Sequence, residues 1–159
     1  MLHFATHTVV DERSLAGTAL VLAPGNGESG FVGAADLAAL ALDADLVVLS
    51  ACQSAGGVVV GGEGMLGLTA PLMAAGARAL VATHWRIDDR EVVPFVDAFY
   101  AALAAGQPAV DALRTAKLRA LRAGQSPRIW SAFAALGDPT VAVPLRTPPA
   151  HWWSGMLRR

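Results

Sequence analysis

The sequence predicts an α/β fold, with helices flanking a mostly parallel β-sheet. Apolar runs of strand length at residues 18–22, 46–51 and 78–83 alternate with segments whose apolar residues recur at helical spacing. The run at 46–51 is apolar or small throughout, which is typical of a central strand buried on both faces. Alternating strands and helices of this kind indicate a layered domain.

The first half of the chain predicts short elements separated by turn residues. Residues 24–30 are dense in such residues and indicate a loop or a hairpin connection. The expected elements are a strand over 1–6, a loop over 9–14, a strand over 18–22, a helix over 34–42, a strand over 46–51 and a glycine-rich loop over 56–64.

The second half predicts longer helices. A helix over 63–75 contains Pro71, expected to bend it, and ends at Gly76 in the C′ position. Asp88 and Asp89 are expected to cap the next helix. The further expected elements are a strand over 78–83, an amphipathic helix over 92–103, a helix from Pro108 with Val110, Leu113, Leu118 and Leu121 inward and Arg114, Lys117, Arg119 and Arg122 solvated, and a strand over 130–136.

Composition indicates one domain with a sizeable core. Hydrophobic residues make up 54% of the 159 residues and the net charge is −1, so a disordered chain is excluded and binding to nucleic acid is not expected. We expect the domain to span 1–145 and a tail to span 146–159. Arginine far outnumbers lysine and alanine is abundant, which suggests a bacterial coding sequence.

The cysteine count and the apolar segments bear on location. The single cysteine excludes an internal disulfide framework and suits a reducing compartment, so we expect a cytoplasmic protein. The most apolar window, 65–81, is interrupted by Pro71, Gly76 and Arg78, so no membrane span is expected. Nor is a signal peptide apparent at the start.

Cys52 and His7 are the candidate catalytic pair. Cys52 follows the strand over 46–51 and His7 follows the first strand, so parallel pairing of those strands would bring both residues to one sheet edge. A thiol near a histidine is the arrangement that nucleophilic catalysis requires. The backbone N–H groups of Cys52 and Thr8 are the candidate oxyanion hole. His3 is expected to be a packed or hydrogen-bonded histidine beneath this site.

Five segments, in this order, resemble the CHAT domains, caspase-like cysteine peptidases of clan CD that are often linked to tetratricopeptide repeats. Together they extend over nearly the whole chain, from residue 2 to about residue 140. The segments are HFATH at 3–7, DLVVLSACQS at 45–54, GEGMLGL at 62–68, GARALVATHW at 76–85, and WSAF at 130–133 with GDP at 137–139.

The resemblance implies a caspase-like fold and cysteine endopeptidase activity toward a protein or peptide substrate. By motif match, Cys52 is the nucleophile and His7 the general base, and neither a metal nor a cofactor is implied. A tetratricopeptide region or a partner chain is the implied associate. The substrate cleft is expected to include Gly57, Glu63, Trp85 and Asp88.

The sequence departs from the family pattern in ways that keep a second function open. Thr8 stands where a glycine is common after the base, and His84 where a leucine is usual. A caspase-like sheet has two strands before the one with the histidine, so we expect the chain to lack the N-terminal part of the domain and to expose a strand edge. The alternative to an endopeptidase is therefore a non-catalytic signalling or scaffold module.

Overall fold

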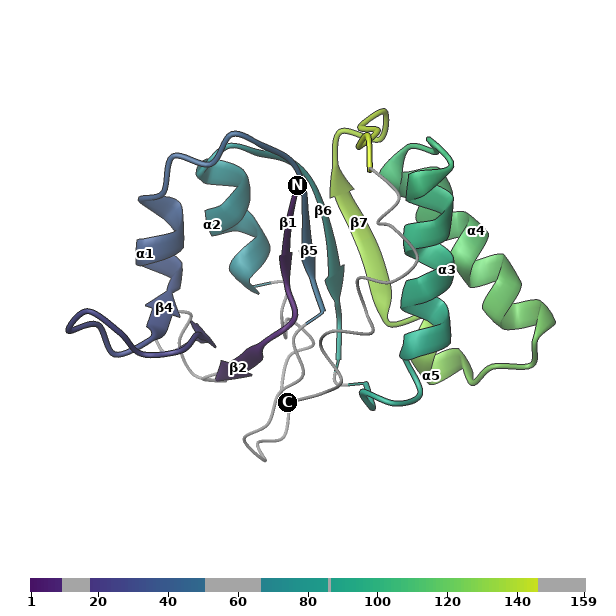
Figure 1. Ribbon diagram of the computed structural model, residues 1–159, viewed down its shortest axis with the longest axis horizontal. Coiled ribbons are helices and arrows are strands. Elements are labelled where there is room, and N and C mark those ends of the chain that lie inside the picture. The colour runs from purple at the N-terminus through teal and green to yellow at the C-terminus, as the bar shows by residue number, and fades with distance from the viewer. Residues whose placement is uncertain (10–17, 51–66, 86, 146–159) are drawn as a thin grey trace, which may run out of the picture.

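A four-stranded, mostly parallel sheet forms the centre of the molecule (Figure 1). The computed structural model describes residues 1–9, 18–50, 67–85 and 87–145. The strand order is β1-β5-β6-β7, with β1 (Leu2–Phe4), β5 (Ala44–Leu49) and β6 (Ala77–Thr83) parallel and β7 (Phe133–Gly137) antiparallel to β6. The predicted α/β class and mostly parallel sheet are confirmed.

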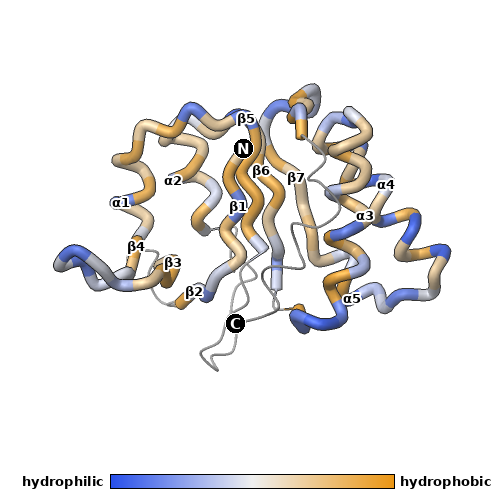
Figure 2. Tube along the Cα trace, viewed as in Figure 1, coloured by the Kyte–Doolittle hydropathy of each residue, from blue (hydrophilic) through white to orange (hydrophobic). Residues whose placement is uncertain are grey.

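Helices cover both faces of this sheet. The helices α1 (Ala34–Ala38) and α2 (Thr69–Ala74) lie on one side, and α3 (Val93–Ala104), α4 (Ala109–Arg122) and α5 (Pro127–Trp130) on the other (Figure 1). Successive strand residues point to opposite faces, so β5 must be apolar at every position that meets a core. Leu46 and Val48 join the core under α3 and α4, whereas Val47 and Leu49 join the core under α2. The middle strands accordingly have the hydrophobic colour in Figure 2.

The helix α3 has the predicted apolar stripe. Phe95, Phe99 and Leu103 are at most 3% exposed and belong to the same core cluster as the facing residues of β5 and β6. Asp88, predicted to cap this helix, instead caps the turn that precedes it. Its carboxylate accepts backbone hydrogen bonds from Arg90 and Glu91.

The helix α4 buries a different stripe from the one predicted. Alanines, together with Leu113, form its buried face, so α3 and α4 pack through small side chains in one core cluster. Val110 and Leu121, expected to point inward, are 38% and 56% exposed. Lys117, expected to be solvated, is partly buried and donates a 2.7 Å hydrogen bond to the Phe133 carbonyl, and burial lowers its pKa.

A second, antiparallel sheet was not predicted. It contains β2 (His7–Val9), β3 (Ala19–Val21) and β4 (Phe31–Gly33) in that order. The expected hairpin at 24–30 joins β3 to β4, where Asn26 and Gly27 both have positive φ, as a type I′ turn requires. His7 therefore begins a strand of this second sheet instead of lying in a loop after β1. The predicted loop over 9–14 begins with a strand residue, and its remainder lies outside the described residues.

Two further expectations need correction. The helix α2 begins only at Thr69, so Pro71 lies in its first turn, where a missing N–H costs no hydrogen bond and no bend is required. Trp130 ends α5, and the strand predicted over 130–136 starts at Phe133 instead. The predicted tail, 146–159, lies outside the described residues. Among the helices that are described, none combines the length and apolar character of a membrane span.

Gly76 closes α2 at the predicted C′ position, with φ of +106°. A Cβ there would collide with the Leu42 carbonyl oxygen, whereas a Cβ on Gly106, at φ +84°, would meet nothing. We expect Gly106→Ala to lower the free energy of unfolding by about 1–2 kcal/mol, because of left-handed backbone strain alone. Gly76→Ala should lower the free energy of unfolding, measured with urea, by more than Gly106→Ala does. Equal decreases for the two variants would contradict the close approach of Gly76 to the Leu42 carbonyl.

Phe95 is 2% exposed and stacks on Phe133 with ring centroids 4.6 Å apart. We expect Phe95→Ala to lower the free energy of unfolding by about 3–5 kcal/mol, because it leaves a cavity between α3 and β7. The exposed Leu121→Ala is the control and should change it by less than about 0.5 kcal/mol. A loss for Phe95→Ala no larger than that of the control would show that this core is not packed as described.

Candidate active site

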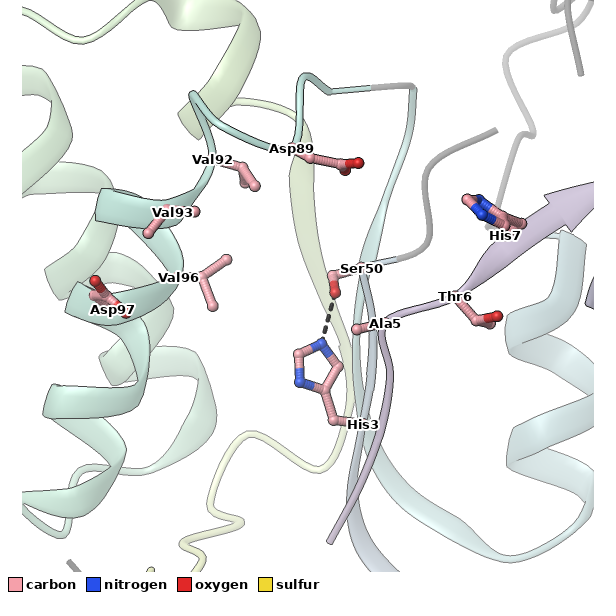
Figure 3. A pocket seen from close by; sticks show the side chains of 10 residues that line it. All are labelled: His3, Ala5, Thr6, His7, Ser50, Asp89, Val92, Val93, Val96 and Asp97. Atoms are coloured by element: carbon pink, nitrogen blue, oxygen red, sulfur yellow. Dashed lines mark hydrogen bonds between the residues drawn. The ribbon is translucent and has the colours of Figure 1, made fainter. Parts of the chain in front are cut away.

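A cleft of about 800 Å³ lies where β1 and β5 end, beside the start of α3 (Figure 3). The carboxyl ends of parallel strands are the usual ligand sites of α/β folds. One wall comes from the first strands and the other from the α3 segment (Figure 3). The described residues that line it are His3, Ala5, Thr6, His7, Ser50, Asp89, Val92, Val93, Val96 and Asp97.

His7 lines this cleft from the side of the second sheet. It begins β2 opposite Val21 and its side chain is exposed. The preceding residue fixes the turn from β1 into β2, because the Thr6 hydroxyl donates a hydrogen bond to the Val21 carbonyl. Figure 3 places the His7 ring across the cleft from Asp89. The imidazole therefore reaches the cleft without being enclosed by the core.

The β5 end is fixed against β1. The Ser50 N–H donates a 3.2 Å hydrogen bond to the Phe4 carbonyl, and Ser50 lines the cleft. Cys52 follows two residues later in the sequence, but it lies outside the described residues, as do Gly57 and Glu63. The distance between Cys52 and His7, and the role of the Cys52 N–H, therefore stay predictions.

The other predicted site residues are all described. Thr8 is 1% exposed within β2, on the opposite face from the exposed His7 side chain. Trp85 donates from Nε1 to the Arg128 carbonyl at 2.8 Å, which connects the end of β6 to α5. Asp88 accepts the backbone hydrogen bonds described above, and its neighbour Asp89 lines the cleft. Contacts of Thr8, Trp85 and Asp88 with a substrate stay predictions.

His3 lies at the base of the cleft with both ring nitrogens engaged. Its Nε2 is 2.6 Å from Ser50 Oγ and its Nδ1 is 2.8 Å from the Tyr100 hydroxyl, and the two rings stack with centroids 5.6 Å apart. Burial lowers the pKa of His3 and raises the pKa of Tyr100. The expectation of a hydrogen-bonded histidine is confirmed, and the His3 residue is nevertheless exposed.

Sequence reasoning missed the wall contributed by α3. Val92 and Val96 were assigned to the apolar face of the helix, and they are only partly buried because that face extends beyond the core into the cleft. Asp97 was not singled out at all. The available signal was spacing, because Val93, Val96, Asp97 and Tyr100 are three or four residues apart and so share one side of a helix. Within the described residues, no three His, Cys, Asp or Glu side chains are grouped so that they could hold a metal ion.

Comparisons with known proteins identify the family of this chain. A family model, that of the CHAT domain, matches residues 1–138. Tetratricopeptide repeat protein 28 of Mus musculus is 36% identical over 107 residues, and its Homo sapiens counterpart is 32% identical over the same length. These matches cover 66% of this chain and 4% of each relative, so the chain corresponds to a small part of those proteins. The match over residues 1–138 shows that the chain belongs to the CHAT domain family, whose members are caspase-like.

Proposed function

We propose that this domain is a cysteine endopeptidase that cleaves peptide bonds through Cys52 and His7. The observation that carries the proposal is that His7 and Ser50 line one cleft, from two neighbouring chain segments, and that Cys52 follows Ser50 by two residues. Membership of a caspase-like family supports a thiol nucleophile at this strand end. A strand-end cleft beside the histidine also leaves space for a peptide.

The proposed reaction proceeds through an acyl-enzyme. His7 accepts the proton of the Cys52 thiol, and the thiolate attacks the substrate carbonyl carbon to form a tetrahedral oxyanion. The backbone N–H groups of Cys52 and Thr8 would stabilise that oxyanion. The C–N bond then breaks as His7 protonates the leaving amine, and water hydrolyses the thioester to release the acid and regenerate the thiol.

The substrate is proposed to be a protein or peptide, contacted by Gly57, Glu63, Trp85 and Asp88. Curated relatives are named as tetratricopeptide repeat proteins, which supports association of this domain with such a repeat region. Repeats of that kind form extended concave surfaces for binding proteins. We therefore propose that the repeats bind the substrate or the signal and that the CHAT domain supplies the thiol.

Alkylation of the single cysteine tests the pair directly. We expect iodoacetamide to react with Cys52 at pH 7 at least about tenfold faster than with an ordinary thiol, whose pKa of about 8.5 leaves only a few per cent thiolate. His7→Ala should return the rate and its pH midpoint to those of an ordinary thiol. His84→Ala is the matched control and should leave both unchanged.

Cleavage of a fluorogenic peptide library measures the activity itself. Cys52→Ala should abolish it, and His7→Ala should lower it by at least about a hundredfold, the usual effect of losing a general base. Ordinary thiol reactivity together with no cleavage would contradict the endopeptidase.

One observation favours the alternative, an interaction module. Within the described residues β1 pairs only with β5, and Leu2 on this edge strand is 37% exposed. An exposed edge strand can accept a strand from another chain. An inert Cys52 combined with concentration-dependent self-association or partner binding would favour this function over catalysis.

A further inference from the structure

The strongest unassigned feature is the set of three side chains centred on His3. His3 of β1 and Ser50, the residue after β5, line the cleft (Figure 3). Tyr100 of α3 contacts His3, so the set connects three parts of the fold. The hydrogen bonds to His3 are 2.6 Å and 2.8 Å long, and the stacked Tyr100 ring restricts the imidazole further. This arrangement leaves the His3 ring little freedom to rotate.

Ser50 is held at both its backbone and its side chain. Its N–H donates to the Phe4 carbonyl and its hydroxyl is hydrogen-bonded to His3, so two neighbouring residues of β1 anchor the residue that follows β5. Only one residue separates Ser50 from Cys52 in the sequence. Anchoring Ser50 therefore fixes one end of the segment that carries the thiol. Residues that orient a reactive group through their own hydrogen bonds commonly affect its reactivity.

We propose that His3 is a positioning residue for the Cys52 thiol, acting through its hydrogen bond to Ser50 and held in place by Tyr100. The proposal rests on the proposed function, because it needs Cys52 to be the nucleophile. It assigns different roles to the two histidines that line the cleft. His7 exchanges the proton, whereas His3 holds Ser50, the residue at which the segment that carries Cys52 begins.

The chemistry of His3 suits holding better than proton exchange. A neutral imidazole has one N–H and one lone pair, so both contacts are satisfied if one partner donates and the other accepts. Partial desolvation lowers the pKa of His3 and raises the pKa of Tyr100, and both shifts favour the neutral forms. The other titratable groups among the described residues of the cleft lining are His7, Asp89 and Asp97, whereas the His3 nitrogens contact Ser50 and Tyr100.

Three variants separate positioning from direct catalysis. His3→Gln removes the imidazole, Ser50→Ala keeps the imidazole but removes its link to β5, and Tyr100→Phe keeps the ring stack but removes one hydrogen bond. The readout is the rate of Cys52 alkylation from pH 5 to 9 with thermal unfolding measured in parallel. His84→Gln and Ser131→Ala are matched controls outside the cleft lining.

If His3 positions the thiol, His3→Gln and Ser50→Ala should each slow alkylation at pH 7 by about tenfold, the effect of losing one well-formed hydrogen bond to a reactive segment. The pH midpoint of alkylation should rise in both variants. The alkylation rate and pH midpoint of Tyr100→Phe should lie between those of these two variants and those of the wild type. The double variant His3→Gln/Ser50→Ala should be no slower than either single variant, because both break the same link.

Two results would overturn the proposal. If Ser50→Ala leaves the rate unchanged or faster while His3→Gln slows it, His3 is itself the base. If all three variants lower the unfolding temperature but keep the wild-type pH midpoint in the folded protein, the network is only structural. His7→Ala distinguishes failure of this proposal from failure of the Cys52–His7 pair. If Cys52 of the wild type is alkylated like an ordinary thiol and His7→Ala does not change that rate, both proposals are refuted.

Discussion

The pairing of β1 with β5 is the constraint on which the candidate site depends. The two strands are parallel, with His3 opposite Val48 and Phe4 opposite Leu49, so the residues after both strands emerge at the same edge of the sheet. A slip of one residue would exchange the faces on which His3 and Phe4 lie. His3 would then lose Tyr100, and Phe4 would leave the core that contains Leu49. Hydrophobic burial on one face thus fixes the polar contacts on the other.

The parts of the fold that the sequence predicts are those where burial dominates. The strands β5 and β6 are uniformly apolar and α3 carries large apolar residues at helical spacing, so pattern and structure agree there. The strand expected over 18–22 is β3, but its partners β2 and β4 were missed, because three residues are too few for a period of two to be recognised. The face of α4 was misjudged because alanine carries little pattern signal, although small side chains let α3 approach closely.

The site could be predicted as a location more readily than as a set of contacts. The rule that ligands bind beyond the carboxyl ends of parallel strands leads to the edge where His7 and Ser50 line the cleft. Asp97 and Tyr100 are far from both in sequence. Asp97 lines the cleft and Tyr100 contacts His3 only because α3 packs beside the strand ends. That packing depends on the core around Phe95 and Phe133, so no local motif reveals it.

The two histidines of the first motif acquire different chemistry from one local change in the backbone. Had β1 continued, His3 and His7 would lie on the same face of one strand, since they are four residues apart. The chain instead leaves the sheet at Ala5, and the Thr6 hydroxyl anchors it to the second sheet. Both histidines are exposed, but His3 keeps two hydrogen-bonding partners at the base of the cleft, whereas His7 lines its side. A general base must gain and lose a proton and reorient toward successive partners, which favours His7 for that role.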